Sequence, residues 1–211
     1  QSGHALHNDR IAQLILDTHQ QGQAQFLVRN FASAKAQSNF ALVAFSQEAP
    51  DIAHLDVVVA IVGAGFGGLC MAIQLLAKGE RRFAILEKGA EVGGTWRDNS
   101  YPGAECDVQS HLYSYSFAGK PDWSQRYAGW QEIQQYILDT TERFGVRPYV
   151  RFNQQVTGLH FDPDTARWRV ILASGLELRV RHVVLATGPL HVPSLPRLPG
   201  LERFTGKVFH S

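Results

Sequence analysis

The segment Gly63–Gly68 holds the residues of this chain whose types and spacing best fit a chemical role. It follows the apolar run Asp56–Val62, precedes the helix-like run Leu69–Ala77, and has the spacing Gly-x-Gly-x-x-Gly. A strand, a tight turn and a helix in this order place unpaired backbone N–H groups at a helix N-terminus, where they attract a diphosphate. The alternative is an ordinary strand–turn–helix corner. We predict a dinucleotide site at Gly63, Gly65, Phe66, Gly67 and Gly68.

Glu87 is the acidic residue that such a site requires. It ends the next apolar run, Arg82–Leu86, and lies 24 residues after Gly63. The acid that binds the ribose of a dinucleotide is expected roughly 20 residues after the glycine motif. A carboxylate there would accept hydrogen bonds from both ribose hydroxyls and would repel a 2′-phosphate, so we expect FAD or NAD and not NADP. The alternative is a solvated glutamate at a strand end.

The composition is that of a globular protein. The chain has 211 residues, of which 45% are hydrophobic and 18% charged, and a net charge of +1, which gives no reason to expect nucleic acid or an anionic membrane. No apolar stretch approaches the roughly 20 residues needed to span a bilayer, and the N-terminus lacks the build of a secretion signal. Two cysteines, Cys70 and Cys106, fit a reducing cytoplasm and unpaired thiols. The nine histidines lack metal-ligand spacing, so we expect no metal site.

Two parts are predicted along the chain. Residues 1–52 form a helical N-terminal extension, and residues 53–211 form an α/β domain that starts with a β-α-β unit. Residues 88–128 are irregular but rich in aromatic side chains, which argues for order, and a helix is predicted over 130–144. Several strands follow, with turns between them: Val150–Phe152, Val156–Phe161, Trp168–Leu172, Leu176–Val180 and Arg181–Ala186.

Three further strings carry a family resemblance. They are Glu87–Trp96, Tyr101–Asp107 with its continuation Ser114–Phe117, and Phe204–His210. Together they make residues 55–211 closely resemble the N-terminal part of Baeyer–Villiger monooxygenases, within the flavin-containing monooxygenase superfamily. The resemblance implies a doubly wound, Rossmann-like FAD-binding domain with an inserted β-meander. It also implies an NADPH-binding domain beyond Ser211, so that this chain is the front part of a larger enzyme.

The resemblance implies an activity as well. An enzyme of this family uses FAD and NADPH to insert one oxygen of O2 next to a ketone carbonyl, through a C4a-peroxyflavin, and gives an ester or lactone. This chain would supply the FAD-binding half and would not be active alone; its partners are the ketone, O2 and the rest of the same enzyme. The alternatives are a flavin monooxygenase that oxidises nitrogen or sulfur, and an inactive FAD-binding fragment. Disulfide reductases do not fit, since Trp96 stands where their first redox cysteine would fall.

Individual roles follow from the same resemblance. Asp107 is the catalytic candidate: a buried carboxylate beside the flavin that orients an Arg of the absent domain, the alternative being a loop Asp that caps local N–H groups. The string Phe204–His210 resembles the start of the family's fingerprint, and its last residue, His210, would steer domain movement. Glu105 and the string Arg97–Ser100 depart from the family pattern, at positions that bear on NADPH contacts and the substrate pocket. Further cofactor contacts are implied for Gly94, Thr95, Trp96, Tyr113, Val156, Thr187 and Gly188.

Overall fold

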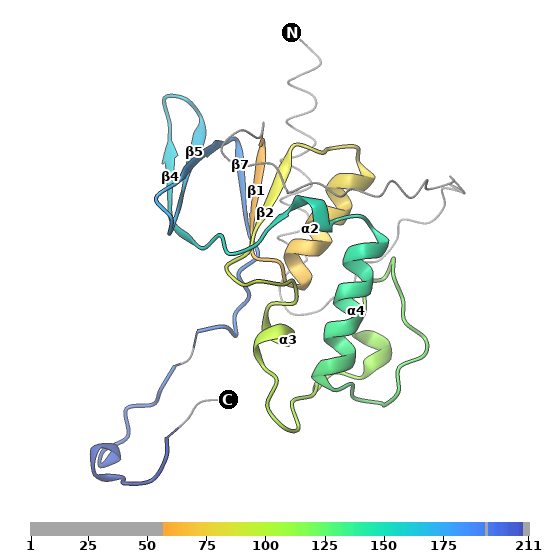
Figure 1. The fold of residues 1–211 in the computed structure, drawn as a ribbon, viewed down its shortest axis with the longest axis vertical. Helices are drawn as coiled ribbons and strands as arrows, with labels where there is room; N and C mark the ends of the chain where they lie inside the picture. The colour runs from red at the N-terminus through yellow and green to blue at the C-terminus, as the bar shows by residue number, and fades with distance from the viewer. Residues whose placement is uncertain (1–56, 193, 209–211) are drawn as a thin grey trace.

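The computed structural model describes residues 57–192 and 194–208, and in these residues the chain forms two sheets. The main sheet is parallel and has the strand order β3-β2-β1-β7 (Figure 1). Its strands are β1 (Val59–Val62), β2 (Phe83–Leu86), β3 (Val150–Arg151) and β7 (His182–Leu185). The second sheet is antiparallel, in the order β4-β5-β6. Its strands are β4 (Val156–Asp162), β5 (Arg167–Leu172) and β6 (Glu177–Val180).

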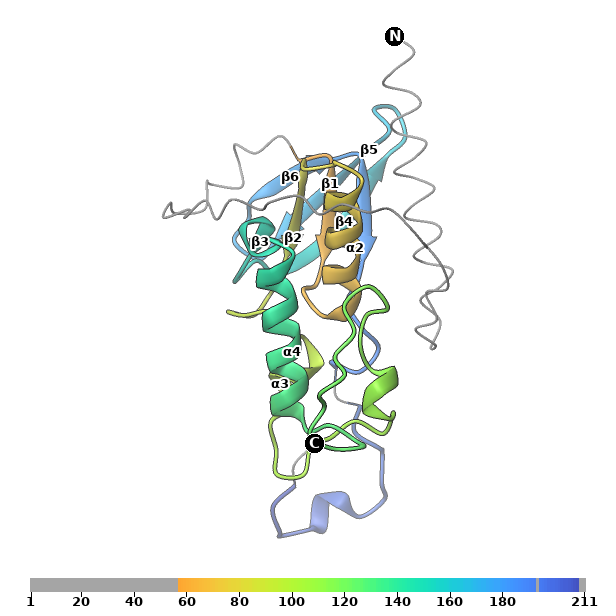
Figure 2. The same cartoon turned by 90° about the vertical axis from the view of Figure 1, so that its right-hand side faces the viewer.

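Helices lie in the connections from β1 to β2 and from β2 to β3. The α-helices are α2 (Phe66–Ala77), α3 (Thr95–Asp98) and α4 (Trp130–Arg143). Short 3₁₀ turns are η2 (Ser110–Leu112), η3 (Arg147–Tyr149) and η4 (Leu201–Arg203). Helix α2 makes the crossover from β1 to β2, as parallel pairing requires. In Figure 2, α2 covers one face of the main sheet and the antiparallel sheet lies behind the other face.

The apolar run of β1 is continuous because both of its faces are buried. Val59 and Ile61 belong to a core shared with α2 and α4, whereas Ala60 belongs to a second core shared with β5 and β6. Strand β2 divides in the same way, with Ile85 on the first side and Leu86 on the second. Side chains alternate along a strand, so a strand between two layers needs apolar residues at every position.

Close packing of α2 on β1 fixes where the glycine turn lies. A Cβ atom on Gly68 would stand 1.9 Å from the carbonyl oxygen of Gly63. Gly63 has a φ of +102°, and a Cβ atom there would stand 2.6 Å from the carbonyl oxygen of Ala186, just after β7. Only glycine fits these two positions, and together they bring the first turn of the helix against the ends of β1 and β7.

The Rossmann-like fold class with its antiparallel insertion is confirmed, and two details differ from our expectations. Helix α2 begins at Phe66, before the expected start at Leu69, because packing against the strand compensates the poor helix propensity of glycine. Strand β3 ends at Arg151, one residue before the end of the predicted strand Val150–Phe152, and pairs in parallel with β2. The predicted extension of residues 1–52 and the fingerprint residue His210 lie outside the described residues.

Both cysteines are free thiols. Burial raises the pKa of Cys70, in α2, to about 11. Cys106 is buried in the loop before η2, and burial raises its pKa too. In the described residues, no helix is long and apolar enough to cross a membrane.

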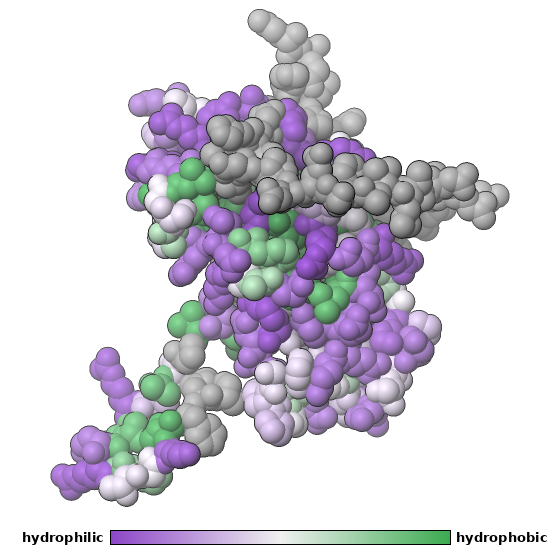
Figure 3. Space-filling view, in the orientation of Figure 1, coloured by the Kyte–Doolittle hydropathy of each residue, from purple (hydrophilic) through white to green (hydrophobic). Residues whose placement is uncertain are grey.

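The segment after β7 leaves the body of the domain (Figures 1 and 3). It reaches η4 with apolar side chains exposed along it, seen as green atoms at the lower left of Figure 3. Leu190, Val192, Leu195 and Leu198 are between 57% and 74% exposed. These side chains therefore take no part in either core.

We expect Gly68→Ala to destabilise the domain strongly, because its methyl group would collide with the backbone of Gly63. A loss of about 2–3 kcal/mol would lower the melting temperature by ~5 °C or more. The measurement is a thermal melt without added nucleotide. Gly67→Ala is the matched control in the same turn, since its new methyl group would have no neighbour closer than 3.8 Å. Equal melting temperatures for the two variants would contradict the packing argument.

Candidate functional site

Two glycines of the turn, Gly65 and Gly67, could carry a side chain without a collision inside the protein. A Cβ atom on Gly65 would approach nothing closer than the Cα of Gly94, at 3.9 Å, and one on Gly67 nothing closer than the Cβ of Ala186, at 3.8 Å. Gly63 and Gly68, in contrast, are needed for packing. The open surface at Gly65 and Gly67 is what a diphosphate needs in order to reach the backbone.

The N-terminus of α2 is uncapped by side chains of the described residues. Gly65 is its N-cap, no side chain caps it among the described residues, and its first turn carries no acidic residue. The N–H groups of a first helical turn have no partner inside the helix, and the helix dipole favours an anion there. The turn thus fits the diphosphate of a dinucleotide, both in shape and in charge.

A second glycine loop lies directly against the first. The N–H of Gly93 donates to the carbonyl oxygen of Ala64 at 2.9 Å. Gly94 has a φ of +56°, and a Cβ atom on it would stand 3.3 Å from the Cα of Gly65. Thr95 then begins α3. The string Gly93–Thr95 is therefore placed beside the turn that we assign to the diphosphate, although 30 residues separate Gly65 from Thr95 in sequence.

Gln134 reaches this loop from α4. Its Nε2 donates to the carbonyl oxygen of Val92 at 2.8 Å, and its side chain occupies the space where a Cβ atom of Gly93 would be. Its Oε1 is buried and has no hydrogen-bond partner among the described residues. Gln134 therefore holds the second loop in place and leaves one acceptor atom unused at its edge.

Glu87 lies at the end of β2 and is only 3% exposed. Its Oε2 accepts a hydrogen bond from the N–H of Ala64 at 2.8 Å. Its Oε1 accepts from the N–H of Gly89 and from Nη1 of Arg97, both at 2.8 Å. The carboxylate is thus joined to the glycine turn of β1, which is the position required of a ribose-binding acid.

Arg97 belongs to a network of charges around this acid. Burial alone would lower the pKa of Arg97, but its hydrogen bonds to Asp98 and Glu87 outweigh this effect and raise the pKa. Glu91 accepts two hydrogen bonds from Arg147, at 2.9 and 2.7 Å. Burial alone would raise the pKa of Glu91, but the hydrogen bonds from Arg147 and from the N–H of Val92 lower it. The loop after β2 is thereby attached to η3 as well as to α4.

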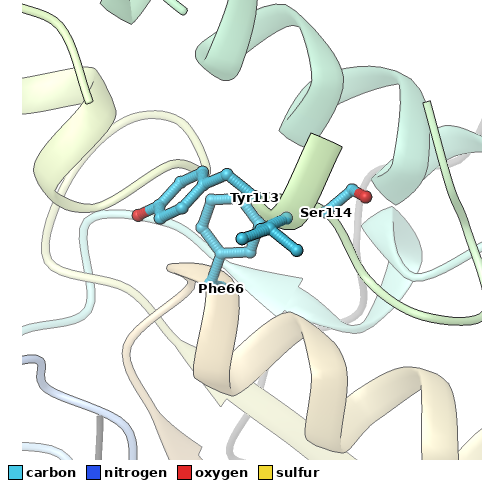
Figure 4. Close-up of a pocket in the computed structure, with 4 residues that line it drawn as sticks. Phe66, Tyr113 and Ser114 are labelled. Atoms are coloured by element: carbon cyan, nitrogen blue, oxygen red, sulfur yellow. The ribbon is translucent and has the colours of Figure 1, made fainter. Parts of the chain in front are cut away.

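Aromatic side chains line the other side of the glycine turn. The indole N–H of Trp96 donates to the hydroxyl of Tyr113 at 2.9 Å, and the two rings meet edge to face at 5.7 Å. The ring of Phe66 meets Tyr113 edge to face at 5.2 Å. Figure 4 shows Phe66 and Tyr113 at a shallow pocket that Leu112 and Ser114 also line.

Tyr113 keeps its proton at neutral pH. Burial raises its pKa to about 12, although the hydrogen bond from Trp96 opposes this shift. Because Trp96 donates to the Tyr113 oxygen, the hydroxyl hydrogen of Tyr113 can point to another acceptor. Tyr113 can therefore act as a donor toward a bound ligand.

Three further residues that we predicted to contact the cofactor lie at the same end of the main sheet: Val156, Thr187 and Gly188. The Cα of Thr187 is 3.6 Å from the place where a Cβ atom of Gly63 would be, and Gly188 follows it with a φ of +71°. The N–H of Gln154 donates to the carbonyl oxygen of Glu87 at 2.8 Å, and Val156 starts β4 two residues later. The structure thus gathers segments that follow β1, β2, β3 and β7.

Asp107 differs from our expectation. We predicted a buried carboxylate, but Asp107 is exposed. Its neighbour Cys106 is buried, and the backbone N–H of Cys106 donates to the carbonyl oxygen of Ala128 at 2.9 Å, so the backbone beside Asp107 is fixed while its side chain faces outward. Within the described residues, the carboxylate of Asp107 makes no hydrogen bond or ion pair.

The sequence reasoning missed the role of Arg97 as a partner of Glu87 and that of Gln134 as a support of the second loop. Arg97 drew attention only as a departure from the family pattern. Gly89 was a usable signal, because a Cβ atom there would stand 2.5 Å from Cζ of Arg97. A glycine two residues after the ribose acid indicates that something bulky lies across it. Gly93 is the corresponding signal for Gln134, because a Cβ atom there would stand 2.0 Å from Oε1 of Gln134.

We expect the stability of the protein to fall as the pH rises from about 10 to about 12. The folded state holds the Tyr113 proton to about 12, whereas the unfolded chain releases it near 10. The stabilisation is complete below pH 10 and is lost as the pH passes through the folded pKa. Tyr113→Phe should make this fall shallower in urea denaturation at pH 9, 10 and 11, by up to about 1.4 kcal/mol per pH unit. Identical slopes for the variant and the wild type would show that Tyr113 titrates normally.

Comparison with known proteins agrees with this geometry. Residues 61–128 match the model of an NAD(P)-binding Rossmann-like domain. A Baeyer–Villiger monooxygenase of Streptomyces coelicolor is 48% identical over 158 residues, which are 75% of this chain and 30% of that protein. The chain thus spans less than a third of the length of this curated relative.

Solved structures give the same result. A steroid monooxygenase bound to NADP superimposes with a TM-score of 0.61 at 40% identity, over 70% of this chain and 29% of that one. The protein OTEMO, in complex with FAD and NADP, superimposes with a TM-score of 0.66 at 30% identity, over 73% of this chain and 30% of that one. The chain therefore belongs to the Baeyer–Villiger monooxygenase family and matches the N-terminal, FAD-binding portion of its members.

Proposed function

We propose that this chain binds FAD and forms part of an FAD- and NADPH-dependent monooxygenase that converts a ketone into an ester or lactone. The observation that carries the proposal is the joining of two features at one end of the main sheet. An uncapped helix N-terminus with open glycines lies there, and the buried carboxylate of Glu87 is hydrogen-bonded to the same turn. A relative named Baeyer–Villiger monooxygenase and a related structure with FAD and NADP support the assignment.

Each part of the site has a role toward FAD. The backbone at Gly65 and Gly67 would take the diphosphate, and Glu87 the ribose of the adenosine half. Trp96 and Tyr113 would form an aromatic wall on the flavin side, together with the backbone of Gly94 and Thr95, all close to the glycine turn. Val156, Thr187 and Gly188 would close the site from the neighbouring strand ends.

FAD, when bound, supplies the chemistry that activates O2 and transfers one of its atoms to the ketone. The protein has to exclude water from the reacting atoms, and the packed rings of Phe66, Trp96 and Tyr113 serve this purpose. Tyr113 remains protonated at working pH and can donate a hydrogen bond to a ligand acceptor. No residue of this chain needs to act as a strong base for these roles.

Asp107 suits contact with a part of the enzyme outside this chain. Its carboxylate is exposed, and the backbone beside it is held by the hydrogen bond of Cys106. An exposed carboxylate on a fixed loop can pair with a cation that approaches from another domain. We propose that it orients an arginine of the NADPH-binding part, so that it positions the reacting groups without reacting itself.

Gly65→Ala should weaken FAD binding by about 10- to 100-fold, because the new methyl group would fill the surface that the diphosphate approaches. The backbone of Gly65 is extended, with a φ of −84°, so alanine is not strained there and the fold should be kept. The measurement is a flavin fluorescence titration of the full-length apoprotein. Gly119→Ala is the matched control, since it adds a methyl group where no atom lies within 4 Å. Wild-type affinity in Gly65→Ala would remove this turn from the site.

Asp107→Ala should lower NADPH-driven ester formation by the full-length enzyme by about 10-fold or more, while FAD affinity changes less than about 2-fold. The readout is the rate of ester formation from a panel of ketones under ¹⁸O2, with one labelled oxygen expected in the product. Asp107→Asn keeps the shape and serves as the second variant. Oxidation of sulfides or amines with no ester from any ketone would replace the proposed reaction by heteroatom oxidation. Undiminished ester formation in both variants would remove Asp107 from the reaction.

A further inference from the structure

The carboxylate of Glu87 is already largely occupied by the protein. A carboxylate oxygen has about two sites for hydrogen-bond donors. Both sites of Oε1 are taken, by the N–H of Gly89 and by Nη1 of Arg97. Oε2 receives one donor, the N–H of Ala64. One acceptor site is left, on Oε2, which differs from our expectation that this acid accepts both ribose hydroxyls.

Arg97 is itself held in a fixed place. Its Nη1 also donates to the carbonyl oxygen of Glu91, and its Nε and Nη2 donate to the two carboxylate oxygens of Asp98, at 2.7 and 3.0 Å. Its guanidinium lies across Gly89, where a Cβ atom would stand 2.5 Å from Cζ and Nη1. The Arg97 side chain is 17% exposed. Four of its five N–H donors are therefore used within the protein.

We propose that Arg97 is a positioning residue for FAD, acting through Glu87. It fixes the carboxylate so that Oε2 alone faces the ribose, and it neutralises a negative charge beside the turn that receives the diphosphate. The inference rests on the proposed FAD site and adds to it the residue that makes a buried carboxylate compatible with a dianionic ligand.

The negative charge of Glu87 would oppose diphosphate binding if no cation balanced it. Glu87 accepts a hydrogen bond from Ala64, which lies inside the glycine turn, so the carboxylate and the bound diphosphate are neighbours. Two like charges at short range in a partly dry site repel each other. A glutamate there binds ribose without penalising the diphosphate only if a cation balances it, and Arg97 is the cation in contact with Glu87.

Lysine cannot replace Arg97 in this arrangement. The guanidinium reaches Glu87 and the carbonyl oxygen of Glu91 through Nη1 while it binds Asp98 through Nε and Nη2. An ammonium is a single point with three donors and does not span these acceptors. Arg97→Lys therefore keeps the charge and loses the geometry, which separates the two parts of the proposal.

A direct contact between Arg97 and the diphosphate is the rival explanation. It would have to use the one remaining N–H, on Nη2, because the other donors are engaged. A double-mutant cycle distinguishes the two cases. A residue that acts through Glu87 loses its effect once Glu87 is made neutral, whereas a residue that touches the ligand keeps it.

The experiment measures FAD dissociation constants of the full-length apoprotein by flavin fluorescence. The variants are Arg97→Met, Arg97→Lys, Glu87→Gln and the double variant Glu87→Gln/Arg97→Met. We expect Arg97→Met to weaken FAD binding by about 10- to 50-fold and Arg97→Lys by about 3- to 10-fold. In the Glu87→Gln background, Arg97→Met should add less than about 2-fold. Riboflavin, which lacks both the diphosphate and the adenosine half, should bind all variants within about 2-fold of the wild type.

Arg169→Met is the matched control, because it breaks an ion pair of β5, with Glu177 at 3.2 Å, that lies in the antiparallel sheet. It should leave both dissociation constants unchanged. Unchanged FAD affinity in Arg97→Met would overturn the inference, as would an equal loss in both Glu87 backgrounds or an equal loss for riboflavin. If Arg97→Met fails to fold, Arg97→Lys takes its place in the test, and its melting temperature shows that it is folded. A wild-type protein that binds no FAD would instead overturn the proposed function.

Discussion

The approach of α2 to β1 is the constraint on which the rest of the molecule depends. Gly68 lies so close to Gly63 that any side chain would enter the backbone, and this contact aims the first turn of the helix at the carboxyl end of the parallel sheet. Everything assigned to nucleotide binding lies at that end. The loop after β2 packs on the glycine turn through Gly94, the carboxylate of Glu87 is bonded to Ala64, and Thr187 follows β7 beside Gly63.

Two cores of different composition keep this arrangement in place. On one face of the sheet, α2 and α4 bury side chains such as Leu69 and Ile137 together with the aromatic loop residue Tyr115. On the other face, the antiparallel strands bury a smaller set around Val170. The edge of the main sheet is short, because the edge strand β3 contributes two residues only. The helical side therefore carries most of the packing that orients the site.

Local signals in the sequence were enough to predict the β-α-β unit and to place Glu87 at the end of its second strand. The run before Gly63, the glycine spacing and the offset of Glu87 are all short-range patterns, and the antiparallel strands had turn residues between them. Periodicity could not identify Arg97 as the partner of Glu87, because the two residues meet through the irregular loop after β2, and the space left by Gly89 does not say which side chain fills it. The exposure of Asp107 was also out of reach, since burial in a loop depends on which other segments cover it.

The raised pKa of Cys70 has a practical consequence for studying this helix. With a pKa of about 11, roughly one thiol in a thousand is ionised at pH 8 in the folded protein, whereas an exposed cysteine with a pKa near 8.5 is ionised to about a quarter. Alkylating reagents attack the thiolate, so Cys70 should react slowly in the folded protein, and local opening between α2 and the neighbouring Tyr115 should speed the reaction. The chain thus carries, within the helix that we propose to receive the diphosphate, a chemical reporter of how often the surroundings of Cys70 open.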